Sequence, residues 1–317
     1  MPRRDDLPDH LRVAPFDVTA ALAAGVSPDR LRSSDLQKAF HGVRSVDLDL
    51  ATVVGLCQAY AARMPESAVF SHLTAAALWG FPLPLWVSTT AIHVSTPVGT
   101  RARRGKMVIG HQTRLGGNVR ALGGLRVTSP ALTWCQLVES LDVPDLIAAA
   151  EFAVTGNAYA RQLPIATFDE LAEASGALEG GNGARRRSKA LAFSREGALS
   201  RPESLLRYLL VTSGLPEPRI NENCNDRRGS FIALADLSWP EFRVAVEYEG
   251  DYHRDVAQFR RDIRRFEKLA DHEWAAIRVS ADDLFDRPQE QVTRIASRLA
   301  ARGWTGRAAA TSLRFAR

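Results

Sequence analysis

Three carboxylates stand at strand spacing within the apolar segment 235–253. Glu247 and Glu249 are two residues apart, so in a strand both side chains point to the same face. Asp236 lies near the end of an earlier apolar run, and the turn that begins at Ser238 lets the next strand fold back toward it. Neighbouring carboxylates in a half-buried strand repel each other unless a cation or a shared proton offsets their charge. The spacing therefore favours a bound ligand over solvated acids at the end of a hairpin.

Hard oxygen ligands of this kind suit Mg²⁺ or Mn²⁺, which use few protein carboxylates and complete their coordination with water and phosphate oxygens. Such an ion activates a water molecule and neutralises the charge that develops on a scissile phosphate. The sequence thus predicts a phosphodiester-hydrolysing site with Asp236, Glu247 and Glu249 as metal ligands. It does not distinguish one ion from two.

Two further residues are candidates for the same site. Glu203 stands three residues after Ser200, a spacing that fits both a capping box at the start of a helix and a metal ligand carried by that helix. His253 follows the last carboxylate, and with an ordinary pKa of about 6.5 it suits a general base, a metal ligand, a phosphate-binding cation or a structural hydrogen-bonding residue. Both sets of alternatives remain open.

The elements that must position these residues alternate between helix and strand. Apolar residues recur at helical spacing in 200–210, 255–271 and 292–299, whereas 231–235, 243–248 and 274–280 are typical of short strands. The predicted order is helix, three strands, of which the first has no assigned bounds, then helix, strand and helix, which indicates an α/β fold. Trp239, at the hairpin turn, is the tryptophan that we expect to be able to touch a base.

Basic side chains are concentrated in this half of the chain. Residues 185–317 hold 25 Lys and Arg against 19 Asp and Glu, whereas the preceding residues hold 16 against 17. An excess of this sign favours an anionic polymer as the partner, and a solvated helix face is the alternative. The candidate nucleic-acid contacts are Arg186, Arg187, Arg260, Arg261, Arg264, Arg265 and Lys268.

The acidic triad and the order of elements resemble the PD-(D/E)XK restriction-endonuclease-like superfamily. More narrowly, residues 234–236, 246–250 and 274–279 resemble the domains related to very-short-patch-repair (Vsr) endonucleases, of the DUF559 type. The resemblance covers about residues 198–300. It implies a mixed sheet flanked by helices and a Mg²⁺-dependent endodeoxyribonuclease.

The same resemblance implies roles for individual residues. Asp236 and Glu247 correspond to the metal-binding acids, Glu203 to the acid of the first helix and His253 to the histidine after the third strand. Glu249 occupies the position of the superfamily's lysine, so the stabilising cation must come from elsewhere. Arg264, Arg265 and Lys268 on the following helix are the candidates for this cation.

The preceding part of the chain predicts a mainly helical α+β domain. Helices are expected over 16–31, 48–62, 71–80, 130–141 and 143–154, and strands over 91–97 and 125–128. Residues 70–75, 92–97 and 125–131 resemble actinobacterial proteins related to the AbiEi-type antitoxin. This resemblance covers residues 15–160 and implies an opening winged-helix segment that binds DNA and a domain that neutralises a toxin. His72 and His93 have no nucleophile or acid cluster near them in sequence, so we expect structural roles for both.

Length and composition indicate two globular domains in 317 residues, of which 45% are hydrophobic and 24% charged. The glycine-rich stretch 176–189 predicts a linker between an AbiEi-like domain of residues 1–175 and a nuclease-like domain of residues 190–317. No apolar run has the length of a membrane span and no signal-like segment opens the chain, so we expect a cytoplasmic protein. Its three scattered cysteines predict reduced thiols, and neither disulfides nor a zinc site.

Three functional hypotheses follow. The first is a metal-dependent DNA endonuclease whose N-terminal domain supplies targeting. The second is an AbiEi-like DNA-binding antitoxin or transcriptional regulator, with a cognate toxin as partner and a catalytically inactive nuclease-like domain. The third is an RNA-binding or repair accessory protein that uses its basic helices without catalysis.

Overall fold

Two compact units make up the chain in its computed structural model. The first contains residues 1–81 and 87–140, and the second contains residues 82–86 and 141–317. The structure describes residues 7–88, 90–102, 104–158, 160–178, 181, 183–250 and 256–317, without the side chains of residues 256–263. The division at residue 140 lies upstream of the glycine-rich stretch from which the sequence predicts a boundary.

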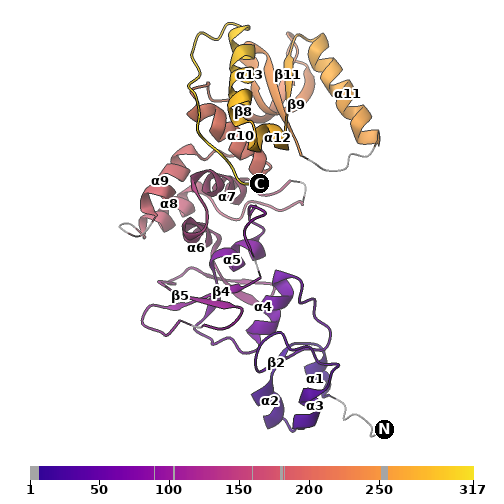
Figure 1. Ribbon diagram of the computed structural model, residues 1–317, viewed down its shortest axis with the longest axis vertical. Helices are drawn as coiled ribbons and strands as arrows, with labels where there is room; N and C mark the ends of the chain where they lie inside the picture. Colours follow the sequence, from indigo (N-terminus) through magenta and orange to yellow (C-terminus); the bar gives the residue numbers. More distant parts are fainter. Residues whose placement is uncertain are drawn as a thin grey trace. The chain divides into compact units, whose positions relative to one another are not determined.

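The first unit is built on a five-stranded sheet in the order β5-β4-β3-β7-β6. Its strands are β3 (Val69–Phe70), β4 (Ile92–Pro97), β5 (Val108–Thr113), β6 (Val119–Leu122) and β7 (Leu125–Thr128). The pairs β4–β5 and β3–β7 are parallel, and the pairs β3–β4 and β6–β7 are antiparallel. Three helices, α4 (Val53–Ala61), α5 (His72–Trp79) and α6 (Pro130–Gln136), accompany the sheet, and the short helix η1 (Leu137–Glu139) follows α6. Figure 1 shows α5 next to β4.

The opening of the first unit consists of short elements around a small apolar cluster that includes Leu11, Phe16 and Leu31. They are α1 (Asp9–Arg12), β1 (Phe16–Asp17), α2 (Val18–Ala23), α3 (Pro28–Arg32) and β2 (Val43–Arg44). The single helix predicted over 16–31 is wrong, because the backbone turns between α2 and α3 with Gly25 at φ +86°. Ser27 then caps α3, whose first residue is a proline.

A four-stranded sheet in the order β11-β10-β9-β8 forms the centre of the second unit. Its strands are β8 (Arg219–Asn225), β9 (Phe231–Trp239), β10 (Val244–Glu249) and β11 (Ala275–Ser280), with η2 (Pro240–Phe242) between β9 and β10. β10 and β11 are parallel, and the other pairs are antiparallel. The helices are α7 (Val143–Thr155), α8 (Phe168–Gly176), α9 (Ala184–Phe193), α10 (Arg201–Thr212), α11 (Val256–Asp271), α12 (Ala281–Phe285) and α13 (Pro288–Ala300).

Helices cover both faces of this sheet. Figure 1 shows α11 on one side and α13 on the other, and α10 contacts both β9 and α13. The apolar residues of β10 are fully buried, with Val244, Ala245 and Val246 each 0% exposed. β10 is therefore a central strand buried on both faces, which corrects the expectation of a half-buried hairpin. The predicted α/β fold is confirmed, with mixed sheets and packed helices.

Within the described residues, no helix combines the length and the hydropathy that crossing a bilayer requires. Cys57, Cys135 and Cys224 are buried free thiols, as the sequence predicts.

Candidate metal and nucleic-acid site

Asp236 lies at the point where β9 and β10 stop pairing. Their antiparallel register runs from Val244 opposite Trp239 to Val246 opposite Leu237. One residue further, Oδ2 of Asp236 accepts the backbone N–H of Tyr248 at 2.7 Å. The carboxylate thus takes the place of a strand carbonyl and is held next to the segment that carries Glu247.

Glu203 approaches the same point from the start of α10. It is 6% exposed, and its carboxylate accepts hydrogen bonds from Ser200 Oγ at 2.8 Å, the Leu199 N–H at 3.0 Å and Asn221 Nδ2 at 2.8 Å. Ser200 also accepts the Glu203 N–H at 3.4 Å, so it caps α10 as predicted. Through Asn221, Glu203 joins the helix start to β8. The same carboxylate therefore helps to fix the helix start and contributes charge to the site.

The environment of Asp236 favours its neutral form. Burial and the nearby negative charge of Glu203 raise the pKa of Asp236 to about 7, against the opposing effects of the Tyr248 N–H and Arg265. A carboxyl group with such a pKa ionises near neutral pH, and a cation placed beside it would favour the ionised form.

Glu247 is the most deeply buried of the predicted ligands in β10, at 3% exposed. Its Oε2 lies 2.9 Å from an Nη of Arg265 on α11, a side chain that is 35% exposed. Arg264 and Lys268 are exposed. Of these three candidate cations, Arg265 is the one whose contact with an acid of the site is seen.

Glu249 takes part in a neighbouring ion pair on β11. It is opposite Ser280 in the parallel register, and its Oε1 lies 3.1 Å from Nε of Arg278. The Arg278 guanidinium also stacks 3.9 Å from the centre of the Phe266 ring. Sequence reasoning missed Asn221 and Arg278, because only strand pairing brings them to the acids. The structure thus places Glu203 beside Asp236 and pairs Glu247 and Glu249 each with an arginine. Among the described residues, no three of these four carboxylates bring their oxygens within 4.8 Å of one another.

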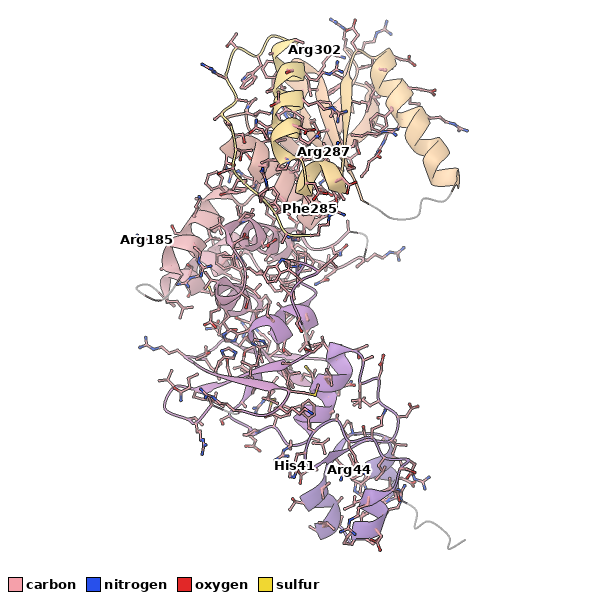
Figure 2. The ribbon with its side chains drawn as sticks, in the orientation of Figure 1. His41, Arg44, Arg185, Phe285, Arg287 and Arg302 are labelled. Atoms are coloured by element: carbon pink, nitrogen blue, oxygen red, sulfur yellow. The ribbon has the colours of Figure 1, made fainter. Side chains whose placement is uncertain are left out.

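The residues predicted to contact nucleic acid differ in their exposure and in whether the structure describes them. Arg187 is 2% exposed and donates to the Leu178 carbonyl at 2.9 Å, so its predicted contact with nucleic acid is wrong: it holds α9 to the end of α8. Arg186 is exposed, as is Arg185 on the same helix (Figure 2). His253 lies outside the described residues, and of Arg260 and Arg261 only the helical backbone of α11 is described.

Trp239 cannot touch a base, in contrast to the expectation from its place in the turn. It is 0% exposed, and its indole N–H donates to the Pro216 carbonyl at 2.8 Å. Burial of an indole ring stabilises the fold when its N–H has a hydrogen-bond partner inside, so the ring is buried and not exposed at the turn.

Comparisons with known proteins give a family. No family model matches the chain. The crystal structure of the RV2827C protein from Mycobacterium tuberculosis covers 60% of this chain and 75% of its own, at 14% identity and a TM-score of 0.40, which is too low to establish a shared fold. Two uncharacterised M. tuberculosis proteins, Rv2248 of strain H37Rv and MT2308 of strain CDC 1551, are each 30% identical to the chain over 227 residues. These alignments cover 71% of the chain and 79% of each relative, so the chain belongs to the family of Rv2248 and MT2308.

Proposed function

We propose that the protein is a metal-dependent DNA endonuclease of the PD-(D/E)XK, Vsr-like class that acts in the cytoplasm. The observation that carries this proposal is the burial of Asp236 beside Glu203 where β9 and β10 separate, which raises the pKa of Asp236 to about 7, with the buried Glu247 on the adjacent strand. Burying carboxylates together costs free energy that a cation would recover. An arrangement of this kind is typical of functional sites.

The chemical type of the donors suits Mg²⁺ or Mn²⁺, and their oxygens must move closer together to bind one ion. Asp236 and Glu247 provide hard carboxylate oxygens from adjacent strands, and Glu203 lies close enough to shift the pKa of Asp236. When bound there, such an ion would supply Lewis-acid chemistry for phosphodiester hydrolysis.

The chain's own residues position this set. The Tyr248 N–H fixes the orientation of Asp236, and Asn221 together with Ser200 fixes that of Glu203. Arg265 brings a guanidinium to Glu247, where it can also contact a phosphate and take the part of the missing lysine. The exposed Arg264 and Lys268 of α11 and the exposed Arg186 of α9 would attract the DNA backbone.

Cleavage assays with two charge-removing variants test the proposal. Supercoiled, linear, mismatched and single-stranded DNA would be incubated with the full chain and either ion, beside Asp236→Asn, Glu247→Gln and the control Glu241→Gln, which changes an exposed carboxylate of η2. We expect metal-dependent cleavage that falls about 100-fold or more in the first two variants and is retained in the control. Equal cleavage by wild type and both variants, or no cleavage of any substrate, would contradict it.

A second candidate is a DNA-binding regulator or antitoxin that does not cut. Two ion pairs favour it, because Arg265 offsets the charge of Glu247 and Arg278 offsets that of Glu249, so neither carboxylate depends on a bound cation for this. The same assays separate the two functions: DNA binding without cleavage, unchanged in Asp236→Asn and Glu247→Gln, would select the regulator.

A further inference from the structure

A cluster of three histidines lies in the first unit. Side-chain ligand atoms of His72, His93 and His111 all lie within 4.8 Å of one another. Nδ1 of His93 is 3.0 Å from Nε2 of His111. Glu139 joins the cluster, with a carboxylate oxygen 3.5 Å from Nε2 of His72 and 3.9 Å from Nδ1 of His111.

Four separate segments bring these side chains together. His93 and His111 lie on the parallel strands β4 and β5, where His111 is opposite Ser95, so both histidines point to the same face of the sheet. His72 is the first residue of α5, and Glu139 ends η1. The backbone N–H of Ser71, the residue before α5, donates a hydrogen bond to the His93 carbonyl at 3.1 Å. Because these residues are far apart in the sequence, their spacing does not indicate a metal site.

The backbone at His72 is strained. Its φ is +51°, a left-handed conformation that costs a non-glycine residue free energy. Its backbone N–H donates to Oε1 of Gln136 at 3.0 Å, and its Nδ1 lies 3.0 Å from Ser71 Oγ. A hydroxyl that engages Nδ1 leaves Nε2, the nitrogen nearest Glu139, as the ligand atom, as is usual for metal-binding histidines.

Two of the three imidazoles are buried. His72 is 4% and His93 is 9% exposed, and the His111 side chain is 18% exposed. With the Glu139 carboxylate beside them, the three adjacent imidazoles present three nitrogen ligands and one carboxylate oxygen.

We propose that His72, His93, His111 and Glu139 form a binding site for one divalent transition-metal ion, of which zinc is the prototype. Imidazole nitrogens select zinc, cobalt, nickel or copper over magnesium, and three His with one carboxylate is a tetrahedral zinc donor set. In such a site with bonds of about 2.0–2.1 Å, ligand atoms are about 3.4 Å apart. The His72–Glu139 separation of 3.5 Å is close to this value, whereas the 3.0 Å between Nδ1 of His93 and Nε2 of His111 is shorter and is that of a hydrogen bond between the rings.

One ring must turn when the ion binds. The His72 and His111 rings are stacked, with centroids 3.6 Å and planes 16° apart, whereas an ion lies in the plane of each imidazole that binds it. His111 is the ring placed to move, because β5 is an edge strand and this side chain is 18% exposed. Its exposure also provides a path for the ion.

Metal titrations of the full chain, free of any affinity tag and treated with a chelator, test the site. Zn²⁺ binding would be followed by calorimetry, and Co²⁺ by its visible absorption, which reports tetrahedral coordination. We expect one ion per chain, with affinity reduced about 100-fold in His93→Gln and in His111→Gln and about 10-fold in Glu139→Gln. The control His272→Gln, an exposed histidine of the second unit, is expected to bind like wild type.

The Asp236→Asn variant separates this site from the carboxylate site of the second unit. It is expected to retain Co²⁺ binding and its tetrahedral spectrum whether or not the protein cleaves DNA. Far-UV circular dichroism would verify that the variants are folded, and Glu139→Gln, which changes a carboxylate that is 55% exposed, removes a ligand with little risk to the core. The proposal is overturned if wild type shows no tetrahedral Co²⁺ spectrum, or if folded His93, His111 and Glu139 variants bind Zn²⁺ as tightly as wild type.

Discussion

At the scale of single residues, Asp236 carries the clearest electrostatic signature of the second unit. Its pKa is raised from 3.8 to about 7, chiefly by burial and then by Glu203. The fold thus binds the proton more tightly than the unfolded chain does. The stability that this provides is complete below about pH 4 and is lost as the pH rises through about 7.

The Asp236→Asn variant tests this sign. In the absence of divalent ions, we expect the variant to gain about 1–3 kcal/mol relative to wild type between pH 5 and pH 8, because Asn cannot ionise and can still accept the Tyr248 N–H. Urea unfolding of both proteins at the two pH values measures the difference. A gap that stays constant with pH, or that narrows toward pH 8, would show that Asp236 is already ionised in the folded state.

Single residues also show where sequence reasoning ends. The sequence alone indicates that Asp236 and Glu247 lie on adjacent strands, because strand alternation and the single turn between them are local features of the sequence. It does not indicate the burial of Arg187, since this depends on the Leu178 carbonyl that α9 meets only after folding. His111 and Glu139 were not singled out, for the same reason: their approach to His72 and His93 depends on the pairing of β4 with β5 and on the position of η1.

At the scale of elements, prediction worked where the chain marks its own boundaries. Asp142 and Ser200 cap α7 and α10 with their side chains, as expected of such residues. α5 begins after Ser71, whose side chain makes no capping hydrogen bond, and ends at Gly80 with φ +82°. β5 and β6 were not predicted, because both are polar edge strands of their sheet without a clear apolar alternation. Their pairing with β4 and β7 depends on distant residues, which a local pattern does not contain.

A buried ion pair joins α7 to α10. Arg207 and Glu151 are each 0% exposed in their side chains and 2.5 Å apart, and Arg207 also contacts Glu217 at 2.7 Å. Burial raises the pKa of Glu151, and Arg207 opposes this shift. A carboxylate at this depth depends on its guanidinium partner.

We therefore expect Arg207→Met to lower the free energy of unfolding by about 3–5 kcal/mol, because Glu151 then keeps a buried charge without its cation. Adding Glu151→Gln should recover part of this loss by removing the charge. The control Glu217→Gln, whose side chain is 38% exposed, should cost less than about 1 kcal/mol. Chemical denaturation of the four proteins measures these values, and a double variant no more stable than Arg207→Met would contradict the electrostatic explanation.

At the scale of the whole molecule, the two compact units each have a core of their own. The first contains Phe70, Ile92 and Val127, and the second contains Ala235, Ala245 and Trp274. Units with separate cores are able to unfold in separate steps. The two candidate metal sites are divided in the same way, since the histidine cluster belongs to the first unit and the carboxylate cluster to the second.

Calorimetry of the full chain should accordingly resolve two unfolding transitions that respond to different changes. Zn²⁺ at about 100 times its dissociation constant should stabilise the first unit by about 2.7 kcal/mol and raise the midpoint of one transition. Arg207→Met should lower the midpoint of the other, since both partners of its ion pair lie in the second unit. A single transition whose midpoint moves with both changes would mean that the units unfold together. In that case each bound ion would stabilise the whole chain, and the separate cores would not act as separate folding units.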